Sequence, residues 1–187
     1  MEDQHGIIFT SDLAKFNIPR TYLSILERNG EIERVSRGVY ITPGSIEDEM
    51  FVFQARYKMS IFSHETALYL HDLTDRTPLS YSITVPVGYH SVTLNKSEHK
   101  IFYANRKLFD LGSVLMKSPH GNEIRTTNLE RTICDVVRSR NQMDVQFMNE
   151  ALKKYVTHMG KNIDQLYKYA TKFRIQKIIR EYIEVLL

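Results

Sequence analysis

Residues 6–41 constrain the fold of this chain more than any other segment, because they predict two short helices followed by a hairpin. The run 10–16 begins with Thr10, a residue type that can cap a helix, and it ends shortly before Pro19. The residue before a proline is pushed out of helical angles, whereas proline itself suits the first turn of a new helix. The sequence therefore predicts one helix before Pro19 and a second from Pro19 to about Asn29.

The second predicted helix is amphipathic and ends before Gly30, which can adopt the left-handed angles that stop a helix. Its apolar residues are Tyr22, Leu23 and Leu26. Its polar residues fall on the other side and are Arg20, Thr21, Ser24 and Arg28. The spacing of Tyr22 with Leu26 favours a core position for the tyrosine ring, with a contact from its hydroxyl to DNA as the alternative.

A β-hairpin is predicted directly after this helix. Ile32 and Val35 lie in its first strand, and residues 39–41 form its second. Residues 36–38, with the sequence Ser-Arg-Gly, make a tight turn between the strands. Two helices followed by a hairpin are typical of a winged helix-turn-helix, and Arg37 then lies at the tip of the wing.

Charge and composition limit the function further. The net charge of +3 is only mildly basic for 187 residues, and residues 1–43 hold five Lys and Arg against six Asp and Glu. Any cations that bind DNA must therefore be arranged rather than abundant. A lone Cys134 excludes an internal disulfide, the charged N-terminus does not resemble a signal peptide, and no run of eighteen apolar residues exists. These features predict a cytoplasmic protein that does not span a membrane.

The turn sequence Thr-Pro-Gly at residues 42–44 is the candidate domain boundary. It separates a predicted DNA-binding domain, residues 1–43, from a second domain, residues 44–187. In the second domain we expect strands within 81–87, 99–103 and 114–116, and helices throughout the region after Thr127. Capping boxes are expected at two helix starts, Ser45 with Asp48 and Thr127 with Glu130. The predicted class is α+β: an N-terminal winged helix-turn-helix, then a mixed α/β domain with a helical C-terminal half.

Four segments follow one another along the chain: GIIFTSDL, ERVSRGVYI, FSHETALYLHDL with ITVPVG after it, and TTNLERTICDVV. In this order they resemble the AbiEi family of antitoxins from type IV toxin–antitoxin systems, which act in abortive infection and phage resistance. The wing alone is shared with many winged-helix repressors, so the specificity of the resemblance comes from the downstream blocks 63–73 and 126–137.

The resemblance implies a protein with two roles. Its winged helix represses the operon that encodes it by binding double-stranded promoter DNA. Its C-terminal domain opposes a nucleotidyltransferase toxin without forming a stable complex with it. A protein of this kind is not an enzyme and needs no metal or cofactor. Family members usually have a helix before the strand at Gly6, and since five residues precede Gly6 here, we expect that helix to be truncated or absent.

The residues expected to contact DNA lie on the second helix, on the wing and just before them. A helix fits the major groove with its polar face on the base edges while flanking cations hold phosphates. Arg20 is the candidate for a bidentate guanine contact, Arg28 for phosphate, and Arg37 for the minor groove or phosphate. Because one winged helix reads only a short half-site, we expect two monomers to meet on an inverted repeat. The full predicted set is Lys15, Arg20, Thr21, Tyr22, Ser24, Arg28, Ser36 and Arg37.

The C-terminal region is the more basic part of the chain. Residues 153–187 hold eight Lys and Arg against three Asp and Glu. Lys161, Lys168 and Lys172 recur at helical spacing, so they are predicted to share one face that meets the nucleic acid on which the toxin acts. The alternative is an ordinary solvated face.

Two other functions are alternatives to DNA binding by an antitoxin. Winged helices also serve as protein-interaction modules, which is the first alternative. The second is a metal-dependent nuclease, because the Glu98-His99-Lys100 segment follows Asp72 and Asp75 and matches a common E-x-K pattern. Alternating charges at an exposed strand end explain that pattern more simply.

Two further motifs are predicted to be structural. His64-Glu65 begins like the zinc-binding helix of a metalloprotease, but Leu68 stands where the second histidine is needed, and no metal site is expected. Arg131 and Asp135 are spaced to form an ion pair along one helix.

Overall fold

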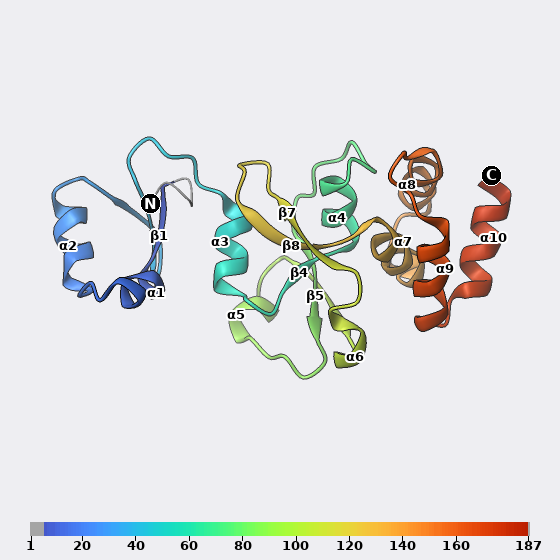
Figure 1. Ribbon diagram of the computed structural model, residues 1–187, viewed down its shortest axis with the longest axis horizontal. Coiled ribbons are helices and arrows are strands. Elements are labelled where there is room, and N and C mark those ends of the chain that lie inside the picture. The colour runs from blue at the N-terminus through green and yellow to red at the C-terminus, as the bar shows by residue number, and fades with distance from the viewer. Residues whose placement is uncertain (1–5, 187) are drawn as a thin grey trace. The chain divides into compact units, whose positions relative to one another are not determined.

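The computed structural model describes residues 6–186 and contains two compact units (Figure 1). The first unit comprises Met1–Tyr57 together with Lys117–Ile124, and the second comprises Lys58–Met116 and Arg125–Leu187. The chain is of mixed α and β structure with a helical C-terminal half, as predicted. The assignment of separate functions to residues 1–43 and 44–187 stays a prediction.

The first unit contains a three-stranded antiparallel sheet in the order β1-β3-β2. Its strands are β1 (Ile7–Phe9), β2 (Glu33–Ser36) and β3 (Val39–Ile41). β2 and β3 are the predicted hairpin, and their register shifts between Arg34 and Ser36. Such a bulge increases the local twist of a strand and bends it. Strand β2 is therefore bent just before the turn of the wing.

Two helices complete the winged helix. α1 (Thr10–Leu13) continues into a 3₁₀ turn, Ala14–Phe16, and α2 (Thr21–Arg28) follows. Asn17 separates them in a left-handed conformation with φ 53°, and Gly30 ends the second helix with φ 73°, as expected. The small core contains Ile8, Leu13, Leu23, Ile32 and Tyr40.

The predicted cap at Thr10 is wrong. Phe9 holds the cap position of α1, and the backbone N–H of Thr10 donates to the carbonyl oxygen of Gly38 at 2.9 Å. This hydrogen bond satisfies one of the free N–H groups of the helix start from the wing instead of from a side chain. The expected loss of a helix before Gly6 concerns residues outside the described range.

The first unit also includes α3 (Glu49–Arg56) and the turn 117–124. The fully buried Asp48 carboxylate caps α3 by accepting from Phe51 N at 3.0 Å, and it also accepts from Asn122 Nδ2 at 2.9 Å and from Ser118 Oγ. The expected capping by Ser45 is wrong because its hydroxyl pairs with that of Thr42. One carboxylate thus joins the start of α3 to a turn about seventy residues later in the chain.

The other sheet has five strands in the order β6-β5-β4-β8-β7, and most of its residues belong to the second unit. β5 runs parallel to β6, whereas β4 is antiparallel to β5 and parallel to β8. The three predicted strand regions correspond to β5, β6 and β7, while β4 and β8 had not been predicted. The strands are β4 (Ile61–Phe62), β5 (Ser82–Pro86), β6 (Lys100–Ala104), β7 (Ser113–Lys117) and β8 (Glu123–Thr127). Short helices connect them: α4 (His64–Leu70), α5 (Val92–Asn95) and α6 (Arg106–Phe109).

The region after Thr127 is helical, as predicted (Figure 1). Asn128, rather than Thr127, caps the first helix by accepting from Arg131 N at 2.9 Å. In the last helix Ile179 and Ile183 are buried in the hydrophobic core of the helical region, and Ile178, Tyr182 and Leu186 are partly buried against it. No helix within residues 6–186 has the length and apolar character to span a bilayer. The helices are α7 (Leu129–Arg138), α8 (Val145–Thr157), α9 (Ile163–Lys172) and α10 (Gln176–Leu186), with a 3₁₀ turn at Arg140–Gln142.

The predicted ion pair between Arg131 and Asp135 is confirmed and is fully buried. Arg131 Nε lies 2.8 Å from Asp135 Oδ2, and both side chains are at most 2% exposed. The guanidinium also donates to the carbonyl oxygens of Leu108 and Leu111 at 2.9 and 2.6 Å, and it lies over the ring of Phe173. Arg131 therefore supplies hydrogen-bond donors to carbonyl oxygens at the end of α6 and in the loop after it.

His64 is a buried structural residue at the start of α4. Its ring stacks on Phe102, Nδ1 lies 2.9 Å from Ser63 Oγ, and Nε2 lies 3.0 Å from Ser139 Oγ. Burial holds the pKa of His64 well below its ordinary value, and the nearby charges of Arg131 and Arg138 lower it further. Both ring nitrogens thus lie at hydrogen-bonding distance from hydroxyl groups of other residues.

A histidine whose pKa is lowered in the folded state makes stability depend on pH. The unfolded chain takes up a proton at His64 below about pH 6.5, whereas the folded chain does not, so folding is favoured above that pH and loses stability below it. We expect the unfolding free energy to fall by up to about 1.4 kcal/mol per pH unit from this residue.

His64→Asn should flatten this pH dependence. Asparagine accepts the left-handed φ of 48° at this position and carries no titrating group. Urea unfolding at a series of pH values measures the slope, and His90→Asn, a change at an exposed histidine, is the control. An unchanged slope in His64→Asn would contradict the assignment, whatever the overall stability of the variant.

Candidate nucleic-acid interface

α2 presents one exposed face to solvent. Thr21, Ser24, Ile25 and Arg28 follow the i, i+3, i+4, i+7 spacing of a single helix face, and all four are exposed. The opposite side carries Leu23, which is 3% exposed, and the partly buried Leu26, both packed in the small core. The sheet and α1 therefore hold α2 by its apolar side and leave its mainly polar side open.

Three arginines of the first unit are available to bind an anion. Arg20 directly precedes α2, Arg28 lies in its last turn, and Arg37 lies in the turn of the wing. All three are exposed, and within residues 6–186 none of them has an acidic side chain at ion-pair distance. A guanidinium that is not already paired can form bidentate bonds to a guanine edge or to a phosphate.

The wing turn is attached to the start of α1. The hydrogen bond from Thr10 N–H to the carbonyl oxygen of Gly38 lies one residue from Arg37, and Gly38 has a φ of 82° that favours glycine. Ser36 is half-buried at the base of the turn, where its carbonyl oxygen accepts from Arg34 Nε at 3.4 Å. The position of Arg37 relative to α1 is therefore set by backbone contacts.

Lys15 is exposed but paired. Its Nζ lies 2.8 Å from Asp12 Oδ1, and the lysine side chain is 71% exposed. Surface pairs of this kind contribute at most about 1 kcal/mol. Lys15 can therefore leave the Asp12 carboxylate and bind a phosphate group at little cost in free energy.

The core position favoured for Tyr22 is wrong. Its side chain is 53% exposed because Leu23 and Leu26 occupy the side of α2 that faces the core. The alternative, a contact from the Tyr22 hydroxyl to DNA, stays a prediction. Ile25, which is 50% exposed, was not singled out by sequence reasoning. The sequence did contain a signal for its exposure, because Ile25 lies among the polar positions of the predicted outer face.

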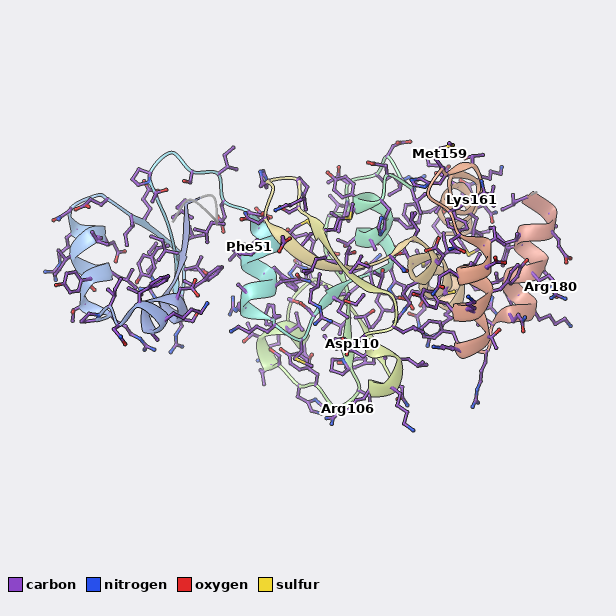
Figure 2. All side chains as sticks on the ribbon, viewed as in Figure 1. Phe51, Arg106, Asp110, Met159, Lys161 and Arg180 are labelled. Atoms are coloured by element: carbon purple, nitrogen blue, oxygen red, sulfur yellow. The ribbon has the colours of Figure 1, made fainter. Side chains whose placement is uncertain are left out.

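The predicted stripe of three lysines in the C-terminal region is only partly assembled. Lys168 and Lys172 are exposed one turn apart on α9, where Asp164 and Thr171 share their face. Lys161 lies before Asn162, the residue that caps α9, in the connection from α8 (Figure 2). Helical spacing does not apply to a residue outside the helix, so the helical stripe comprises two lysines and not three.

The residues of the nuclease alternative are dispersed. Lys100 Nζ lies 2.8 and 2.7 Å from the two carboxylate oxygens of Glu65, and Asp75 pairs with Lys154 at 2.8 Å. Within the described part of the chain, no three His, Cys, Asp or Glu side chains are grouped so that they could hold a metal ion. The E-x-K lysine thus forms a surface ion pair with α4.

The fold of the N-terminal unit and its exposed helix face define a winged helix-turn-helix. Residues 2–43 match a family model described as transcriptional regulator, AbiEi antitoxin, which confirms the resemblance for that segment. The chain is also similar in fold to the RV2827C protein from Mycobacterium tuberculosis, with a TM-score of 0.59 and 12% sequence identity. That match covers 89% of this chain and 66% of the other, so the chain spans about two thirds of its length. No curated protein matches the sequence.

Proposed function

We propose that this protein is a type IV antitoxin and transcriptional autorepressor, which binds the promoter of its own operon through α2 and the wing. The observation that carries the proposal is the exposed face of α2 with the unpaired Arg20, Arg28 and Arg37 beside it, within the segment that matches the regulator family. In this role α2 enters the major groove, and Arg37 reaches a neighbouring phosphate or minor groove.

The division of contacts follows from their positions. Arg20 at the N-terminal end of α2 reads a base edge, with Thr21 and Ser24 as additional hydrogen-bonding groups and Tyr22 at the edge of the same surface. Arg28 at the far end of α2 holds phosphate, as do Lys15 and the wing, where Ser36 supports the turn. Two monomers bind an inverted repeat, because one such module reads too few base pairs for high specificity. A repressor of this kind works in the cytoplasm, and no catalytic step, metal or cofactor takes part.

Promoter binding and its salt dependence test the proposal. We expect the protein to bind the DNA upstream of its gene more tightly than a scrambled fragment, with an affinity that falls steeply as salt is raised because bound phosphates release counterions. Gel-shift titrations at several salt concentrations measure both quantities. Equal binding to the two fragments, or none to either, would overturn the proposal.

A winged-helix protein-interaction module is the second candidate. It is favoured by two exposed apolar side chains between α1 and α2. Phe16, at the end of the 3₁₀ turn, is 72% exposed, and Ile18, in the loop after it, is 41% exposed. Such a module would show no preference for the promoter, so the same titration separates the two functions.

In this proposal the antitoxin role belongs to residues 44–187, where the C-terminal helices oppose a nucleotidyltransferase toxin without a stable complex. Lys168→Glu with Lys172→Glu should reduce the rescue of cells that express the toxin, because the exposed charge on α9 would no longer attract a nucleic acid. The control is Lys96→Glu with Lys107→Glu, which makes the same charge change at exposed lysines elsewhere in the second unit. Growth rates at matched protein level measure rescue, and equal rescue by both variants would show that α9 is only a solvated face.

A further inference from the structure

We propose that Ile25 recognises the 5-methyl group of thymine in the promoter, and that it thereby selects A·T pairs at one position of each half-site. This inference rests on the proposed function, since it names what one residue of the DNA-binding face reads. It concerns an apolar side chain in the middle of a face that is otherwise polar.

The position of Ile25 on α2 supports this role. It is one turn beyond Thr21 and one turn before Arg28, and it is 50% exposed. The core of the first unit is filled on the opposite side of the helix by Leu23. An isoleucine on this face therefore meets whatever lies against α2.

The chemistry of the major groove offers one apolar group. Base edges there present hydrogen-bond donors and acceptors, and thymine adds a methyl group at C5. A branched aliphatic side chain gains free energy by covering such a methyl and gains nothing from a donor or acceptor. If Thr21, Ser24 and Arg28 face base edges or phosphates, the side chain between them is placed to meet a methyl group.

The surroundings of Ile25 favour DNA over a second protein surface. The centres of protein interfaces are depleted of charged residues other than arginine, and they enclose groups of large apolar side chains. Ile25 has polar Thr21 and Ser24 and the unpaired Arg28 as its neighbours on the face, and these side chains match a polyanion with hydrogen-bonding base edges. The nearest exposed aromatic ring, Tyr22, carries a hydroxyl that suits the same partner.

Replacing thymine by uracil tests the inference, because uracil keeps the hydrogen-bonding edge and lacks only the methyl. Uracil is placed at each thymine of the protected promoter DNA in turn. Wild-type protein should lose about fourfold in affinity at one position per half-site, because the free energy of burying one methyl group is lost. Uracil at thymines outside the protected DNA is the control.

Ile25→Ala completes the cycle. It should bind thymine and uracil versions of that position equally, while Ile25→Val should keep part of the preference. Because Ile25 is half-exposed, neither variant should unfold, and circular dichroism checks this.

If the promoter binds but no thymine responds, or if Ile25→Ala still prefers thymine, the inference is wrong. If no promoter binding occurs, the proposed function itself fails. If Ile25→Ala instead splits a dimer seen by gel filtration without DNA, Ile25 belongs to a protein interface and the inference is overturned.

Discussion

Arg131→Met is expected to lower the unfolding free energy of the second unit by about 3–5 kcal/mol, the usual cost of removing one partner from a buried ion pair. Methionine keeps part of the side-chain volume but leaves Asp135 buried without its nearest charge. It also removes the donor to the carbonyl oxygens of Leu108 and Leu111. Urea unfolding followed by far-UV circular dichroism is the measurement, since the chain has no tryptophan.

Arg138→Met is the matched control for this prediction. Arg138 contacts the same aspartate at 3.5 Å and the same Phe173 ring, but its side chain is 37% exposed, so its loss should cost at most about 1 kcal/mol. Burial raises the pKa of Asp135, and without Arg131 that effect is stronger. A carboxyl whose pKa is raised in the folded state stabilises the fold while it is protonated, and this contribution is lost as pH rises. The loss of unfolding free energy in Arg131→Met should therefore be smaller at about pH 5 than at about pH 8. Equal costs for the two arginines would contradict the role assigned to Arg131.

Arg20→Ala is expected to remove most of the preference for promoter DNA over scrambled DNA, about 1–3 kcal/mol or roughly 5- to 150-fold, because a bidentate guanine contact carries that much discrimination. Arg37→Ala should instead weaken binding to both DNAs in parallel and reduce the salt slope by about one. Parallel titrations of the two variants against both fragments measure these effects.

The two arginine variants control for each other. Both side chains are exposed and unpaired within the described residues, so neither change should alter folding, and each removes one positive charge. Any difference between them in specificity therefore reflects what each contacts. If both variants lose affinity equally for both DNAs, Arg20 binds phosphate and the division of contacts is wrong.

The winged helix was predictable from the sequence because its signals are local. Pro19 and Gly30 delimit α2, and the Ser-Arg-Gly turn marks the wing, through backbone preferences that do not depend on the rest of the fold. The ion pair between Arg131 and Asp135 was predictable for the same reason, since helical spacing alone brings the two side chains together.

Features set by tertiary contacts were not predictable. Thr10 was expected to cap a helix by itself, but the wing supplies the hydrogen-bonding partner. Strand β4 spans two residues and carries no readable alternation, and it exists because β5 and β8 pair with it. The exposure of Tyr22 depends on which apolar residues of α2 pack into the core of the folded unit, and these are Leu23 and Leu26. Lys161, by contrast, lies outside α9 for a local reason, because Asn162 caps the helix. The polar side of α2 was itself predictable from the sequence, whereas the exposure of Tyr22 and Ile25 follows from the folded unit.

The most direct test of the central claim, that α2 and the wing tip bring this protein to its own promoter, is repression of a reporter gene placed behind that promoter. The wild-type protein and the Arg20→Ala, Arg37→Ala double variant are supplied from another promoter at matched level. We predict that the wild type represses the reporter and the double variant does not. Repression by the double variant equal to that of the wild type, or no repression by the wild type, would contradict the claim.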